Sequence, residues 1–362
     1  MRFVVARHLG RRGEGLGNEI LPWAKGWIAS QVLDAHLVGP AWGLNRRKYY
    51  RNFRTSRMDF FWEELLAHLP HHAFTEQDYR ITGEIDFGKA IRKWAESNGL
   101  SGKRSFIVTV DSMCGGYPSI RNARPFLWSQ LLNSRDALRN VYEILSTLDR
   151  CKLFVAVHMR LSDDFDTPKE NESQRGKFNQ KIPGKWYLGV CEALQRTFGD
   201  TLQFHFFTDR GGAAFNEAVR RFNPSQRPQH GLTECSDLLL MALADLRICS
   251  VSSYSMIASF LSDGPYIWYE PQLYYSNGIY SLWGMEEAQR KPGSLTVSSI
   301  EQMEKIGPGA EWESGFKGYA MQADSPVPRG LADQLRRKLI TNDRSASLLE
   351  YGCLPDWVMK QS

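Results

Sequence analysis

The sequence lacks any long hydrophobic run. Among its 362 residues, no apolar stretch approaches the roughly 18 residues that a membrane-spanning helix needs. Near the first residue, only residues 3–6 are apolar before charges resume, which is too short a run for a signal peptide. Internal repeats and low-complexity tracts are also lacking. We therefore expect a cytoplasmic protein with no membrane span.

The six cysteines form no recognisable motif. They are scattered along the chain without a Cys-x-x-Cys pair, and several lie in apolar runs. Zinc sites and disulfide frameworks of small domains show closely spaced or regularly paired cysteines. The pattern here is instead typical of buried thiols that behave as small apolar side chains. We predict free thiols.

Neither sign of charge dominates the chain. Its 45 Lys and Arg against 40 Asp and Glu leave a net charge of +5. This mild excess suits a phosphorylated ligand, but it is too diffuse to indicate a nucleic-acid partner. The densest basic stretch, residues 46–57, interleaves Arg and Lys with Tyr and Phe. A solvated loop is the favoured interpretation, and a stacking surface or an acceptor wall for sugar rings is the alternative.

One stretch that the chain does contain is a buried strand ending in charged side chains. Residues 153–157 form a continuous apolar run with β-branched residues, as expected of a parallel strand covered on both faces. His158, Arg160 and Asp163 follow at once. Ligands bind at the carboxyl ends of such strands, and a guanidinium there grips phosphate with two hydrogen bonds. An Arg–Asp salt bridge that closes the strand end is the alternative.

Two later segments bring polar groups to the same predicted edge. Residues 204–208 form a second apolar strand, which ends at Asp209. Asp237 opens a helical run that leads into a short strand and then the pair Ser252 and Ser253. Strands that alternate with helices of 10–15 residues predict a parallel sheet, so these three polar clusters share one edge.

The first residues predict another strand, followed by a glycine-rich loop. The strand covers residues 2–6, and the loop holds Glu14, Gly15, Gly17 and Asn18 before a helix that extends to about residue 33. Glycines let the backbone approach a phosphate closely, and the amides at a helix start attract anions. The loop is therefore a second candidate phosphate site.

These motifs, in this order, resemble those of the GDP-fucose fucosyltransferases. The family motif His-x-Arg-x-x-Asp is matched by His158, Arg160 and Asp163. A later Asp, followed by a helix and a strand into Ser-Ser, is matched by Asp237 and the serine pair. Motifs cover residues 1–33 and 151–262, whereas the rest of the chain matches little.

The glycine loop carries the other half of the resemblance. Gly15, Gly17 and Asn18 match a Gly-x-Gly-Asn loop, and Glu14 lies within a Gly-Glu-Gly that some protein O-fucosyltransferases share. The chain departs from the family at Leu161, where many members have a second Arg. It departs again at Arg210, where some have a second Asp. These departures leave the acceptor linkage open.

The resemblance implies an α/β fold of the GT-B type, in which two Rossmann-like domains face each other across a cleft. Residues 1–150 would form the acceptor-side domain with the glycine loop. Residues 151–330 would form the GDP-sugar-binding domain, and 331–362 a terminal helix and tail. It also implies an inverting, metal-independent transferase. That enzyme would move fucose from GDP-β-L-fucose to a hydroxyl of a glycan or small glycoside, without a cofactor.

The resemblance also implies roles for the donor-side residues. Arg160 would hold the β-phosphate, helped by the amides of Gly15 and Gly17 and by Ser252 and Ser253. Asp237 would accept hydrogen bonds from guanine N1 and N2, with His158 beside the base. Asp209 would contact the ribose or brace the site.

The catalytic base has more than one candidate. Glu14 is favoured, and Asp163 or Asp164 is the alternative; a salt bridge from Glu14 to Arg11 or Arg12 is a purely structural role. Asp164 and Asp166 also match the Asp-x-Asp motif that binds Mn²⁺ or Mg²⁺ in GT-A transferases. We favour the metal-independent reading, because arginine and amide donors replace the charge of a metal ion.

Three further alternatives stay open at this stage. The glycine loop invites a dinucleotide fingerprint, but Ile20 stands where its third glycine belongs. A different GDP-sugar is an alternative donor, since no residue of the sequence indicates recognition of the fucose methyl group. A protein that binds nucleotide sugars without turning them over is the other alternative.

Overall fold

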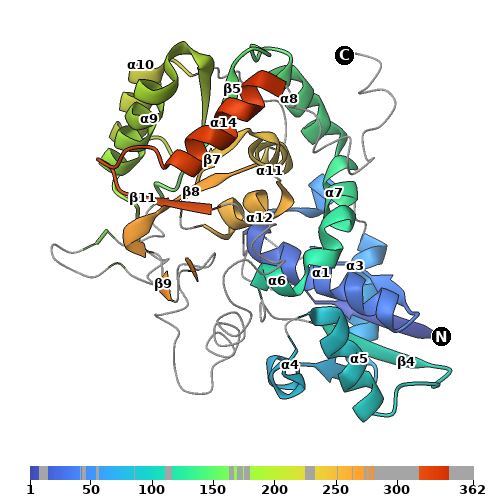
Figure 1. Cartoon of the computed structure of the whole chain (residues 1–362). Helices are drawn as coiled ribbons and strands as arrows, with labels where there is room; N and C mark the ends of the chain where they lie inside the picture. Colours follow the sequence, from blue (N-terminus) through green and yellow to red (C-terminus); the bar gives the residue numbers. More distant parts are fainter. Residues whose placement is uncertain are drawn as a thin grey trace. The chain divides into compact units, whose positions relative to one another are not determined.

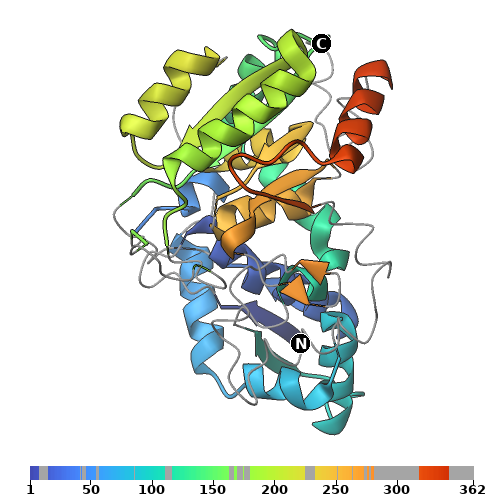
Figure 2. The same cartoon turned by 60° about the vertical axis from the view of Figure 1, so that its left-hand side comes forward.

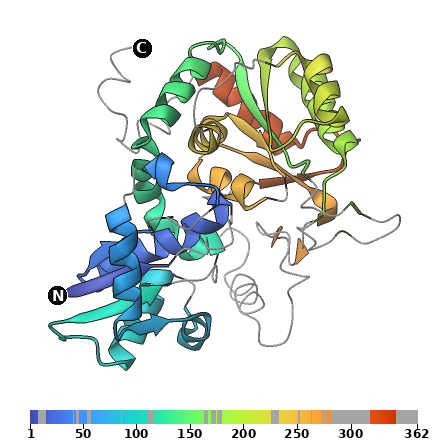
Figure 3. The same cartoon turned by 180° about the vertical axis from the view of Figure 1, so that it is seen from behind.

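The protein consists of two units, each built around its own sheet (Figures 1–3). The computed structural model describes residues 1–7, 15–40, 42, 46–53, 57–84, 86–110, 116–162, 167–168, 174, 180–224, 233–250, 252–262, 264–272, 275–276, 279–280 and 318–341. Unit 1 holds the described residues of Met1–Ser134, and unit 2 those of Arg135–Gln289 and Gly307–Ser362. The fold is α/β, with helices packed on parallel sheets.

Unit 1 contains a four-stranded parallel sheet in the order β2-β1-β4-β3. Its strands are β1 (Arg2–Ala6), β2 (His36–Val38), β3 (His72–Phe74) and β4 (Phe106–Val110). The central pair β1 and β4 is fully covered at its carboxyl half, as a doubly covered parallel sheet requires. The predicted first strand is therefore confirmed.

Helix α1 (Leu16–Val32) packs on β1 of unit 1 at very short range. A Cβ built on Gly26 would lie 2.5 Å from the Cβ of Ala6, so glycine is what lets this helix approach the strand. The remaining helices of the unit are α2 (Tyr50–Phe53), α3 (Arg57–His68), α4 (Glu76–Thr82), α5 (Phe87–Ser97), α6 (Gly116–Ser119), η2 (Arg121–Ala123) and α7 (Arg124–Leu132).

Unit 2 contains a five-stranded parallel sheet in the order β11-β8-β7-β5-β6. Its strands are β5 (Leu153–Met159), β6 (Leu202–Thr208), β7 (Leu246–Ile248), β8 (Tyr266–Tyr269) and β11 (Gly318–Met321). A separate antiparallel pair is formed by β9 (Tyr275–Ser276) and β10 (Ile279–Tyr280). The alternation of strands and helices predicted for this half is confirmed.

The strand order of unit 2 contains one topological switch point. From β5 the chain crosses to β6 on one side, and then returns to place β7, β8 and β11 successively on the other. The switch point therefore lies between β5 and β7. In doubly wound sheets the ligand crevice lies outside the carboxyl ends of the two strands at this point.

The two faces of β5 pack against different helices. Leu153, Val155 and Val157 belong to a core cluster with residues of α9 (Gly184–Phe198) and α14 (Arg329–Thr341). His158 points to the opposite face, toward α12 (Ser253–Leu261). The other helices of unit 2 are α8 (Arg135–Leu145), η3 (Gly199–Thr201), α10 (Ala213–Phe222), α11 (Glu234–Leu243) and η4 (Glu270–Gln272).

Helix α8 groups with unit 2, although it lies within the span that we assigned to the N-terminal domain. It packs along α11, and the amide of Asn140 donates to the hydroxyl of Ser236 over 3.4 Å. Helix α14 is tied to the same unit, because Lys338 contacts the buried carboxylate of Asp245 at 3.0 Å. That carboxylate also accepts from the backbone N–H of Phe154.

The described cysteines are free thiols, as predicted from their spacing. Cys191, Cys235 and Cys249 are buried, and Cys151 is exposed. Burial raises the pKa of Cys249 to about 11, so this thiol stays protonated at neutral pH. Within the described part of the chain, no helix is both long and apolar enough to span a bilayer.

Candidate functional site

The candidate site is built from the carboxyl ends of β5 and β7, both labelled in Figure 1, at the switch point of unit 2. Strand β5 ends with His158 and Met159, and Arg160 follows directly. Strand β7 ends at Ile248 and leads through Ser250 to the start of α12. The strands pair side by side, so their last residues are brought to one edge.

His158 is held by two serines that follow β7. Its Nδ1 lies 2.7 Å from the hydroxyl of Ser255 and 3.0 Å from that of Ser250. Both hydroxyl oxygens also accept backbone N–H groups, from Ser250 and Ser252 respectively. Because each hydroxyl can both donate and accept, the two serines fix the position of the imidazole in either neutral tautomer.

The environment of His158 keeps its ring neutral. The side chain is only 4% exposed. Burial, reinforced by the nearby charge of Arg160, lowers the pKa of His158 to about 4, and Asp209 opposes this shift weakly. At neutral pH the ring is therefore a polar contact with one donor nitrogen, not a cation.

The start of α12 provides a capped helix end beside this histidine. The hydroxyl of Ser252 accepts from the backbone N–H of Tyr254 at 3.2 Å, as an N-cap does. Ser253 is the first helical residue. Because the first amides of a helix attract anions, this end suits a phosphate.

Tyr254 connects His158 to the start of α11. The two rings lie 5.5 Å apart in a tilted arrangement, and the phenol of Tyr254 donates to the backbone carbonyl of Glu234. Asp237 lies one turn further along α11 and is partly buried. Helix α11 leads into β7, so its first turn lies at the carboxyl edge of the sheet, and Asp237 belongs to this edge.

Arg160 is fixed by the carboxylate that ends the neighbouring strand. Its Nε lies 2.9 Å from Oδ2 of Asp209, with both side chains less than a fifth exposed. Oδ1 of Asp209 accepts from the backbone N–H groups of Leu161 at 2.8 Å and Ser162 at 3.3 Å. One carboxylate therefore orients the guanidinium and holds the loop that follows β5.

The titration of Asp209 agrees with this bracing role. Burial alone raises the pKa of its carboxyl group. The hydrogen bonds from Ser162 and Leu161, together with the charge of Arg160, outweigh burial and lower the pKa below its usual value. Asp209 is therefore ionised at neutral pH and supports a charged Arg160. From the sequence, the alternative to a phosphate site was a salt bridge between Arg160 and Asp163. The structure shows an ion pair of Arg160 with Asp209, and Asp163 lies outside the described residues.

The glycine loop of unit 1 is described only in part. Gly15 is the N-cap of α1 in an extended conformation, and a side chain built there would meet open space. Gly17 and Asn18 lie within the first turn of the helix, which begins at Leu16 and so earlier than predicted. The carbonyl of Gly17 accepts from the phenol of Tyr117 at 3.4 Å. Three predicted phosphate-loop residues thus lie at a helix start.

All candidates for the catalytic base lie outside the described residues. These are Glu14, Asp163 and Asp164, and Asp166 of the Asp-x-Asp sequence lies outside them too. In the part of the chain that the structure describes, no group of three or more His, Cys, Asp or Glu side chains is arranged to hold a metal ion.

Sequence reasoning missed three residues of this site. Ser250 and Ser255 hold His158, and Tyr254 packs beside it. These three residues flank Ser252 and Ser253 in the sequence, so their spacing could have placed them in the same turn after β7. Only the pairing of β5 with β7 shows that this turn faces the histidine.

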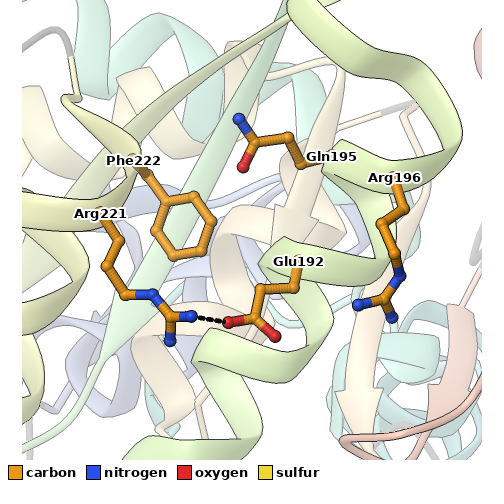
Figure 4. A pocket seen from close by; sticks show the side chains of 5 residues that line it. All are labelled: Glu192, Gln195, Arg196, Arg221 and Phe222. Atoms are coloured by element: carbon orange, nitrogen blue, oxygen red, sulfur yellow. Dashed lines mark ion pairs between the residues drawn. The ribbon is translucent and has the colours of Figure 1, made fainter.

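Unit 2 also has a surface hollow away from this candidate site (Figure 4). It has a volume of about 370 Å³ and is lined by Glu192, Gln195, Arg196, Arg221 and Phe222. These residues occupy the last turns of α9 and α10, which start at the carboxyl edge of the sheet and end at the opposite edge. The hollow is thus remote from the switch point, and Arg221 is already paired with Glu192.

Comparisons with known proteins yielded weak likenesses only. No protein-family model and no curated protein matches the chain. Among solved structures, POFUT1 in complex with GDP-fucose is similar at 15% identity and a TM-score of 0.40, covering 73% of this chain and 93% of that one. POFUT1 in complex with GDP gives 15% identity and 0.39, covering 73% and 96%. The site therefore rests on its own geometry.

Proposed function

We propose that the protein is an inverting glycosyltransferase that uses GDP-β-L-fucose and binds it at the switch point of unit 2. The observation that carries the proposal is Arg160, oriented by Asp209 at the end of β5, next to neutral His158 and the capped start of α12. Such an arrangement supplies a fixed cation and helix amides beside a neutral imidazole, which suits a sugar diphosphate.

The proposed chemistry is displacement of GDP from the anomeric carbon. As the bond to the sugar breaks, negative charge grows on the β-phosphate. Arg160 would stabilise that charge with preorganised donors, because Asp209 already fixes its orientation. The amides at the start of α12 would add partial positive charge. This set of donors supports metal-independent transfer.

Guanine recognition is assigned to the first turn of α11. Asp237 would accept from guanine N1 and N2, a pairing that adenine does not offer. Tyr254 donates to the carbonyl of Glu234 in this turn and packs beside His158. The residues proposed to bind the guanine base are therefore in contact with those proposed to bind the phosphates. Nothing in this set distinguishes fucose from another GDP-linked sugar.

The acceptor hydroxyl must lose its proton as it attacks. Glu14 is the proposed base, with Asp163 or Asp164 as the alternative. Gly15, Gly17 and Asn18 follow Glu14 at the start of α1, where their amides would attract the diphosphate. The acceptor is proposed to be a carbohydrate or glycoside hydroxyl.

Release of GDP from GDP-fucose, with water or a panel of added glycosides as the fucosyl acceptor and with or without EDTA, tests the proposed function. We expect turnover that survives EDTA, and Glu14→Gln should retain donor binding while transfer collapses. Activity that EDTA abolishes and Mn²⁺ restores would contradict metal independence and favour Asp164 and Asp166 as ligands. Binding of GDP-fucose without any turnover would make the chain a binding protein.

A further inference from the structure

Helix α3 exposes a continuous apolar face on unit 1. Four of its side chains are large, apolar and exposed: Met58 by 61%, Phe61 by 56%, Trp62 by 51% and Leu65 by 38%. Leu69, which is 42% exposed, continues the same turn because its N–H donates to the carbonyl of Leu65 at 3.2 Å. Soluble proteins rarely leave such a contiguous patch open without a binding role.

The spacing of these residues places them in one narrow stripe. At about 100° per residue, the five side chains fall within an arc of about 100° around the axis of α3. The buried residues Glu63 and Leu66 lie outside this arc, on the flank where α3 contacts β1 and β2. The acidic residues Asp59 and Glu64 also lie outside the stripe. Helix α3 thus packs on the sheet through one face and exposes an apolar stripe on another.

Basic side chains lie directly before this helix. Arg46, Arg47, Lys48 and Arg51 are all exposed. Phe53 ends α2 and Arg57 begins α3, so the two helices are joined by a link that spans at most about 15 Å. The basic segment therefore lies within reach of the apolar stripe.

The basic segment is firmly anchored to the core of unit 1. Tyr49 and Phe53 pack on the buried ring of Trp42, with ring centroids 6.1 and 4.4 Å apart. Phe53 also meets Trp23 edge-on at 5.1 Å. Tyr49 and Phe53 therefore hold the segment against the core, while Arg46, Arg47, Lys48 and Arg51 are exposed on the surface.

We propose that α3 and the basic segment, residues 46–51, form a docking surface for an anionic membrane. An apolar stripe rich in Trp, Phe, Leu and Met inserts at the boundary between headgroups and acyl chains, and adjacent cations are attracted to anionic lipids. Charge complementarity selects this partner. The surface belongs to unit 1 and shares no residue with the proposed donor site.

Co-sedimentation of the full chain with lipid vesicles tests the proposal. We expect binding to vesicles that contain phosphatidylglycerol and much weaker binding to pure phosphatidylcholine. Phe61→Ser combined with Trp62→Ser should weaken binding by about tenfold or more, because two inserted side chains are lost. Met58→Gln with Leu65→Gln is a second pair with the same expected direction.

Two controls distinguish docking through this surface from nonspecific adsorption to vesicles. Arg46→Gln with Arg51→Gln should weaken binding by about fivefold per charge, and only to anionic vesicles. Ile81→Ser removes an equally exposed apolar side chain, 71% exposed on α4, and should change nothing. Vesicle binding that the α3 variants leave intact would overturn the proposal. So would a dimer in sedimentation velocity that those variants dissociate, because the stripe would then join two copies.

Discussion

Arg160 is the side chain on which the proposed chemistry depends most. Arg160→Lys keeps the positive charge but loses the planar fork that binds phosphate through two hydrogen bonds. We expect turnover of GDP-fucose to fall on the order of 10²–10³-fold, with little change in thermal stability. Steady-state release of GDP measures the effect. Turnover near that of the wild type in a normally folded variant would remove Arg160 from the mechanism.

Asp209 acts through Arg160 and so should behave as a positioning residue. Asp209→Asn can still accept from the N–H groups of Leu161 and Ser162, but it loses the ion pair. We expect kcat to fall less than in Arg160→Lys, by about tenfold, since the guanidinium remains but is less well oriented. Asp200→Asn, at an exposed carboxylate in η3, is the matched control and should leave kcat unchanged. An equal loss in both variants would contradict the assignment.

His158 should make the protein less stable as the pH falls. Its pKa in the folded protein, about 4, is below the value near 6.5 expected after unfolding. The unfolded state therefore binds a proton first, and stability is lost between pH 6.5 and about 4, by on the order of 3 kcal/mol. The difference in unfolding free energy between wild type and His158→Gln, followed by urea titration across this range, measures it. A difference that is independent of pH would contradict a buried neutral ring.

At the scale of elements, the contact between α1 and β1 depends on Gly26. An alanine there would place its Cβ 2.5 Å from the Cβ of Ala6 and 3.2 Å from its Cα. Alanine favours helix formation by up to about 1 kcal/mol, but overpacking against the strand outweighs this gain. We expect Gly26→Ala to destabilise unit 1 by about 1–3 kcal/mol in chemical denaturation.

Gly330 near the start of α14 is the control for that substitution. A Cβ built on Gly330 would lie 3.4 Å from the phenol oxygen of Tyr319, its nearest neighbour, which is an ordinary contact. Gly330→Ala should therefore be neutral or slightly stabilising. If both variants lost stability equally, the close approach of α1 to β1 would not explain the glycine.

The strands were predictable from sequence because they are covered on both faces. Residues 153–157 and 204–208 are apolar runs that leave little choice but a buried strand, and both are observed. The start of α1 was placed too late, since Gly17 favours a loop by propensity while packing makes it helical. Tertiary contact decided the boundary.

The site was predictable only where the chemistry is local. His158 and Arg160 follow one strand, and so their common location could be predicted from sequence spacing. The pairing of Asp209 with Arg160 could not, because it depends on the register that pairs β5 with β6 and brings Met159 opposite Thr208. Ser250 and Ser255 likewise required the neighbouring position of β7. Long-range register carries this information, and sequence spacing does not.

For the whole molecule, the strand order of unit 2 gives the site its place. The order β11-β8-β7-β5-β6 has its switch point between β5 and β7, and His158, Arg160, Ser252 and Ser253 lie at or just beyond the carboxyl ends of these two strands. The fold and the side chains therefore point to the same edge independently. The central claim is that this edge binds a guanosine diphosphate.

Calorimetric titration of wild-type protein and Arg160→Lys with GDP, ADP and UDP in the presence of EDTA tests that claim most directly. We expect wild-type protein to bind GDP about tenfold or more tighter than ADP or UDP, because guanine offers Asp237 a paired set of donors. Arg160→Lys should weaken binding of all three nucleotides while the preference for GDP remains. Equal affinity for the three nucleotides in wild-type protein, or unchanged affinity in Arg160→Lys, would contradict the account.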